Sequence, residues 1–133
     1  MQAATPHVSV EATGVTPTQA EGGWQFAWRV TNTGEDDVSL ESVWFPHGKF
    51  RGAEQPLEPL RTLPPGSETT LERVVACAGE PGDQVENAFL IMHVNWGGQP
   101  WRIFTRLRII FDDQSRPRSV TELITTQPVG FTG

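Results

Sequence analysis

Few side chains in this sequence could act as a nucleophile or as a metal ligand. The chain has one cysteine, Cys77, and three histidines, His7, His47 and His93. A catalytic thiol needs a base beside it, and no histidine lies close to Cys77 in the sequence, so we interpret this residue as a small core side chain. The histidines are scattered, without the close spacing of zinc ligands. We therefore expect no enzyme, no metal centre and no cofactor.

Calcium is a secondary alternative, because acidic residues are expected where the connections 47–66, 78–86 and 112–118 meet. Those turns carry five nearby carboxylates, those of Glu80, Asp83, Glu86, Asp112 and Asp113. Clustered carboxylates can bind a hard cation, but they can equally pair with Lys49 and Arg51. No ordered Asp-x-Asp-x-Asp loop is present, so solvated acidic turns are the favoured interpretation.

The best candidate for a binding surface is one face of residues 87–111. Two apolar runs alternate with a period of two and are joined by a Gly-Gly turn, which predicts a β-hairpin. One face carries Met92 and Ile103 and is expected to point into the protein. The other face is expected to point outward and carries Phe89, Ile91, His93, Arg102, Phe104, Arg106, Arg108 and Ile110.

Solvent-facing strands seldom need so many large apolar side chains. Arginine and aromatic residues are enriched at protein interfaces, and large exposed apolar patches mark binding partners. Two explanations stay open: residues 119–131 fold over this face, or the face binds another protein, which could be a second copy of the chain. The residues that we select as binding candidates are Phe89, Ile91, His93, Phe104, Arg106 and Arg108.

A second candidate surface is the basic and aromatic piece formed by His47, Lys49, Phe50 and Arg51. Its alternative interpretation is a loop that covers a sheet edge with Phe50 buried. Carbohydrate binding is a further alternative, because the chain has five tryptophans. Strand phase favours core packing for four of them (Trp24, Trp28, Trp96 and Trp101) and leaves only Trp44 unassigned.

About seven strands are expected to position these side chains. Alternation and turn residues mark 7–12, 24–31, 38–45, 68–77, the two arms of 87–111, and 116–126. A phase slip near Ser42 and Val43 indicates a bulge. The four prolines of 47–66 argue against a helix or a central strand there, so we interpret this segment as a long loop. With no amphipathic helix, this pattern predicts an antiparallel β-sandwich of the immunoglobulin-like kind.

Size and charge restrict the function further. The chain has 133 residues and a formal net charge of −6, so we expect a single domain spanning 1–133, with 119–133 as an additional strand or a tail. The negative charge disfavours nucleic acid and anionic membranes as partners. Residues 1–10 show no signal-peptide pattern, which predicts a cytoplasmic protein if Met1 is the native start.

Two stretches resemble bacterial immunoglobulin-like modules of the cell-adhesion-related (CARDB) type. Residues 28–36, Trp-Arg-Val-Thr-Asn-Thr-Gly-Glu-Asp, are similar to their strand and acidic turn, and residues 63–67, Leu-Pro-Pro-Gly-Ser, are similar to their proline–glycine turn. The resemblance covers roughly residues 24–77 and implies a binding or scaffolding role. In architecture the chain also resembles the intracellular proteinase inhibitors of the BsuPI kind, although no inhibitory loop can be matched. The sequence thus predicts a non-catalytic protein-binding module that uses the outer face of 87–111, with proteinase inhibition or carbohydrate binding as alternatives.

Overall fold

A computed structural model describes residues 4–130 of the chain. This part of the molecule consists of eight strands and contains no helix that could cross a membrane. The strands are β1 (Val8–Pro17), β2 (Gly23–Asn32), β3 (Val38–His47), β4 (Phe50–Leu63), β5 (Glu68–Ala76), β6 (Gln84–Trp96), β7 (Gln99–Phe111) and β8 (Pro117–Pro128).

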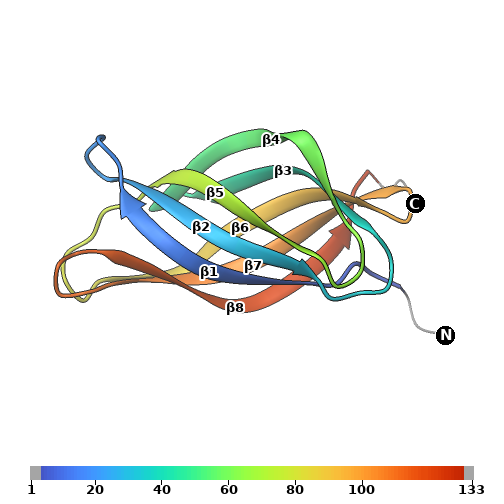
Figure 1. Cartoon of the computed structure of the whole chain (residues 1–133). Helices are drawn as coiled ribbons and strands as arrows, with labels where there is room; N and C mark the ends of the chain where they lie inside the picture. Colours follow the sequence, from blue (N-terminus) through green and yellow to red (C-terminus); the bar gives the residue numbers. More distant parts are fainter. Residues whose placement is uncertain (1–3, 131–133) are drawn as a thin grey trace.

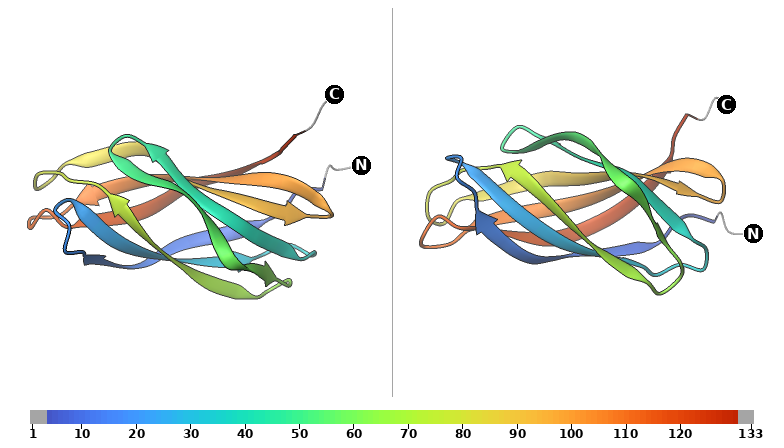
Figure 2. Two further views of the ribbon diagram at one scale, coloured as in Figure 1. Left: turned by 90° about the horizontal axis from the view of Figure 1, so that it is seen from above. Right: turned by 45° about the horizontal axis from the view of Figure 1, so that its top comes forward.

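All neighbouring strands are antiparallel, and their order is β1-β2-β5-β4-β3-β6-β7-β8. The sheet curls so that β1, β2 and β5 form one layer and the other five strands form the second layer (Figures 1 and 2). The layers are joined loosely. β4 and β5 share one residue pair, Arg51 with Ala76, and the Thr121 hydroxyl of β8 donates a hydrogen bond to the Val10 carbonyl of β1 at 2.8 Å. The architecture is therefore a nearly closed, flattened sheet.

The core lies between the layers because alternate residues of every strand point inward. Its centre is an aromatic cluster in which Trp28 packs against Phe26 and Phe45, with ring centroids 5.2 and 5.4 Å apart. Phe50 meets Phe26 edge-on at 5.1 Å. The Trp28 indole N–H donates to the Ser119 hydroxyl at 3.3 Å. This cluster connects strands from both layers, so it compensates for their sparse backbone pairing.

Asn32 joins the two stretches that resemble immunoglobulin-like modules. Its side-chain N–H groups donate to the carbonyls of Asp36 and Leu63, both at 2.8 Å, and its side-chain oxygen accepts from the Gly34 N–H at 2.9 Å. The Asn32 carbonyl also accepts from the backbone N–H of Gly66 at 2.8 Å. The buried amide thus fastens the β2–β3 turn to the proline–glycine turn.

The expectation of an antiparallel all-β protein is confirmed, including the hairpin of 87–111 and the bulge near Ser42, where the register shifts between Leu40 and Ser42. The expected number of about seven strands is wrong by one. The missing strand is β4, in the segment that its prolines led us to interpret as a loop.

The prolines of β4 are compatible with a strand because of where β4 lies. It pairs with β3 along one side, but its other side meets β5 only at Arg51. Most of β4 therefore behaves as an edge strand, where a missing N–H is tolerated. Between the pairs Leu40–Arg61 and Ser42–Pro56, residues 57–60 form an insertion that contains Pro59.

Candidate binding face

The hairpin has the expected strand phase. Met92 and Ile103 are completely buried and belong to the core cluster. Phe104 alternates with these core positions and is half-buried. Ile91 is only 6% exposed but does not belong to the core cluster. The expectation that Met92 and Ile103 point inward is confirmed, and Ile91 is covered from outside the core.

Register explains what covers Ile91. Trp44 of β3 pairs with Ile91 of β6, and Ile91 pairs with Phe104 of β7. Directly opposite residues of antiparallel strands share a face and lie about 4.5–5.5 Å apart at Cβ. Ile91 is therefore flanked by two aromatic side chains on the outer surface, which leaves its own side chain little exposure.

Two further rows continue this surface. One row runs from Ser42 through His93 and Arg102 to Gln127, and the other runs from Phe89 through Arg106 to Leu123. The Phe89 and Phe104 rings meet edge-on with centroids 6.5 Å apart. We call this outer surface of β3, β6, β7 and β8 the hairpin face; its residues are Ser42, Trp44, Phe89, Ile91, His93, Arg102, Phe104, Arg106, Arg108, Leu123, Thr125 and Gln127.

Sequence reasoning missed two of the most exposed apolar members of this face. Trp44 is 39% exposed and Leu123 is 47% exposed. Trp44 could have been placed on this face from its strand phase after the bulge in β3. Leu123 lies opposite Arg106, and this pairing becomes known only with the register between β7 and β8. Together they extend the apolar surface beyond the hairpin on both sides.

The arginines of the face are partly neutralised by acidic side chains. Arg108 lies 2.9 Å from one carboxylate oxygen of Glu122, and Arg106 lies 3.9 Å from the other. Arg108 also lies 3.8 Å from Glu86. Exposed ion pairs of this kind contribute about 0–1 kcal/mol. They orient the guanidinium groups and leave Arg102, for which the described residues provide no ion pair, as the open cation of the face.

His93 takes part in a small polar cluster at the edge of the face. Glu54 of β4 accepts a hydrogen bond from the Ser42 hydroxyl at 2.8 Å, and the same carboxylate oxygen lies 3.3 Å from Nδ1 of His93. A serine nucleophile must donate its proton to the histidine. Here the hydroxyl donates to the carboxylate, so the cluster positions His93 and does not activate Ser42.

The chain segment that could have covered the face lies elsewhere. β8 pairs with β7 along its whole length and adds a strand to the sheet (Figure 1). The interpretation that 119–131 folds over the hairpin is therefore wrong for residues 119–130, and residues 131–133 lie outside the described part. β8 pairs with β7 because the backbone N–H and C=O groups of β7 need hydrogen-bond partners on that side.

The second candidate surface is smaller than expected. Phe50 is completely buried in the aromatic cluster, so it cannot contact a partner, and the alternative of a buried Phe50 is confirmed. His47 turns back on its own loop, where Nδ1 accepts a hydrogen bond from the backbone N–H of Lys49 at 3.0 Å. Lys49 and Arg51 stay exposed.

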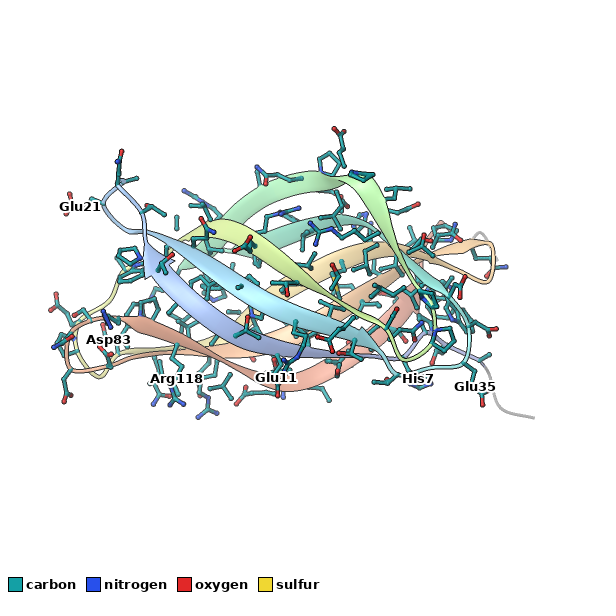
Figure 3. The ribbon with its side chains drawn as sticks, in the orientation of Figure 1. His7, Glu11, Glu21, Glu35, Asp83 and Arg118 are labelled. Atoms are coloured by element: carbon teal, nitrogen blue, oxygen red, sulfur yellow. The ribbon has the colours of Figure 1, made fainter. Side chains whose placement is uncertain are left out.

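The acidic turns expected to meet at one end use their carboxylates to organise the backbone. Asp83 accepts from the N–H of Glu80 at 2.9 Å, and Asp112 accepts from the N–H groups of Gln114 and Arg116 at 2.8 and 2.9 Å. These backbone hydrogen bonds hold the pKa of Asp112 below its ordinary value. Asp83 lies at the end of the molecule opposite to the end that carries His7 (Figure 3). Within residues 4–130, no three acidic, histidine or cysteine side chains are arranged to hold a metal ion.

Cys77 is buried, and burial raises the pKa of its thiol from 9.0 to about 11. At pH 8 we expect the native protein to react with a thiol reagent about 100-fold more slowly than the unfolded chain, because thiolate is the reactive species. Between pH 9 and 11 the folded protein keeps the Cys77 thiol proton that the unfolded chain releases. The thiol should therefore decrease the free energy of unfolding as the pH rises through this range. Denaturation of the wild type and of Cys77→Ala across this range measures the effect. A native thiol that reacts at the unfolded rate would contradict the assignment.

No protein-family model matches the chain, and no curated protein matches it either. The class that the fold defines is an antiparallel all-β domain, and its hairpin face carries Trp44 and Leu123, two large exposed apolar side chains.

Proposed function

We propose that this chain is an immunoglobulin-like β-sandwich that binds another protein through the hairpin face and performs no catalysis. The strand order supports the fold assignment, because β1-β2-β5 and β3-β6-β7 correspond to the A-B-E and C-F-G strands of that architecture. The observation that carries the function is the row Trp44–Ile91–Phe104, a line of apolar side chains on an outer surface.

The opposite outer surface provides the contrast. There β1, β2 and β5 present mostly polar and charged residues, and paired positions include Arg29 with Glu11 and Arg29 with Thr70. A sheet that packs against the core with one face needs only polar residues on the face that contacts water. The hairpin face carries more large apolar side chains than a solvent-exposed sheet face requires. Aromatic residues with arginine neighbours are typical of protein interfaces.

The dimensions of the patch favour a transient contact, and the net charge of the chain favours a different protein over a second copy. Four strands and three rows span roughly 14 Å by 14 Å between Cα positions. A stable interface buries about 800 Å² per partner, more than this apolar area supplies. Two copies would also bring together chains that each carry a net charge of −6. A transient contact with a partner whose carboxylates meet Arg102 suits the surface better.

Site-specific photo-cross-linking tests this proposal. A photoreactive phenylalanine is placed at position 104 or, as the control, at position 74. Val74 is 56% exposed on the opposite outer surface. In cells that make the protein, we expect one discrete heterologous adduct from position 104 and none from position 74. Equal adducts from both positions, or a covalent homodimer alone, would contradict binding of another protein through this face.

A further inference from the structure

Two arginines occupy inward positions on the strands that flank the split between the layers. Along β5, Arg73 has the same parity as Leu71 and Val75, which are both completely buried. On β4, Arg61 lies opposite Leu40, another completely buried core residue. Both arginines are partly buried, and removing a charge from water is unfavourable unless the charge is paired. Two inward arginines side by side therefore need an explanation.

The separation of β4 from β5 gives these side chains their space. The strands pair only at Arg51 and Ala76, and β4 then arches away from β5 (Figure 1). The result is a groove of about 430 Å³ between the two strands. The residues that line it are Gln55, Pro56, Leu57, Glu58, Arg61 and Arg73.

The structure fixes both guanidinium groups without neutralising them. Nη1 of Arg61 donates to the Thr69 hydroxyl at 3.1 Å and also to the Thr70 carbonyl. Nη1 of Arg73 donates to the Glu72 carbonyl at 2.7 Å, while its Nε is buried and has no hydrogen-bond partner among residues 4–130. Neither arginine forms an ion pair with a described residue, although Glu58 lines the same groove.

The surroundings of Arg73 are less favourable to its positive charge than water is. Burial, and then the like charge of Arg61, lower the pKa of Arg73. A buried donor without a partner adds a desolvation cost. An anion held between the two guanidinium groups would offset the repulsion between them.

We propose that the groove between β4 and β5 binds a phosphate group through Arg61 and Arg73. Phosphate at pH 7 carries a charge of about −1.5 to −2, which matches two cations, and offers several strong acceptor oxygens. The planar guanidinium fork fits such oxygens in bidentate fashion. Nη2 of each arginine makes no hydrogen bond with a described residue and remains available for this contact. The site is independent of the hairpin face.

Titration with inorganic phosphate, followed by the side-chain Nε–H resonances of the arginines, tests this site. At constant ionic strength, with chloride as the reference anion, we expect saturable shifts at Arg61 and Arg73 and none at Arg118, an exposed arginine of β8 that does not line the groove. Arg61→Gln and Arg73→Gln should each weaken phosphate binding at least about tenfold, since each removes charge-assisted hydrogen bonds. Glu58→Gln should strengthen binding, because it removes a competing negative charge. Arg118→Gln serves as the matched control and should bind like the wild type.

Two further arms identify the ligand. A phosphate monoester that binds more tightly than inorganic phosphate would indicate a phosphorylated small molecule, whereas equal affinity would indicate the free ion. Acetate should bind more weakly than either because it has a single charge. Shifts that never saturate, or that persist unchanged in both Arg61→Gln and Arg73→Gln, would overturn the proposal and leave the two arginines as solvated side chains that fill the split.

Thermal unfolding gives an independent measurement on the same proteins. Phosphate stabilises many proteins by exclusion from their surface, and that effect is common to the wild type and the variants. Binding adds a stabilisation that grows with the ratio of ligand concentration to Kd. We expect phosphate to raise the Tm of the wild type more than that of Arg73→Gln. Identical increases in both proteins would contradict a specific site.

Discussion

Phe104→Asp is expected to abolish binding of the partner and to leave the fold intact. Phe104 is half-buried in the middle of the hairpin face, beside Ile91 and edge-on to Phe89. A carboxylate there would remove the central apolar anchor and place a charge against the partner. Loss of a hot-spot residue costs at least about 2 kcal/mol, or roughly 30-fold in Kd. Titration of the partner identified by cross-linking gives the affinity, and circular dichroism reports the fold.

Two matched variants make this result interpretable. Leu123→Asp changes an exposed residue of the same face, so it should weaken binding with little effect on stability. Val74→Asp makes the same kind of change on the opposite outer surface and should bind like the wild type. Binding that survives both Phe104→Asp and Leu123→Asp would show that the partner contacts a different surface.

Asn32→Ala is expected to give the largest loss of stability from a single polar residue. The side chain makes three hydrogen bonds, to Gly34, Asp36 and Leu63, and is completely buried. Alanine would leave the Leu63 carbonyl without this partner at a buried site. Each orphaned buried group costs about 1–3 kcal/mol, so we expect a loss of about 2–4 kcal/mol in the free energy of unfolding. Urea denaturation measures this loss.

Thr33→Ala provides the control for this variant. Thr33 is the next residue in the same turn, and its side chain is exposed. Its backbone N–H donates a hydrogen bond to the His7 carbonyl, which alanine would preserve. Its stability should stay within about 0.5 kcal/mol of the wild type. If Asn32→Ala were equally harmless, the two turns would be held together by something other than the amide.

The strand phase of the hairpin could be predicted because the alternation of apolar and polar residues is visible directly in the sequence. Met92 and Ile103 could be assigned to the core in this way. β4 could not, because its prolines are tolerated only at an edge, and no local pattern shows that β5 would leave that edge open. Its existence depends on the tertiary arrangement of β3 and β5.

The candidate face was likewise only partly visible in the sequence. Alternation along β6 and β7 identified Phe89 and Phe104, but the contribution of Trp44 depends on a bulge whose position fixes which side of β3 it occupies. Arg61 and Arg73 showed no motif at all. Their proximity follows from strands that are paired at one end and separated at the other, which is a property of the whole sheet.

Radical footprinting of the free and the partner-bound protein tests the central claim most directly. Among residues 4–130, four large apolar side chains are exposed and can report on the surface: Trp44 and Leu123 on the hairpin face, and Leu60 and Val74 away from it. We predict that partner binding protects Trp44 and Leu123 from oxidation and leaves Leu60 and Val74 unchanged. Protection of Leu60 or Val74 with full oxidation of Trp44 and Leu123 would contradict the assignment of the hairpin face as the binding surface.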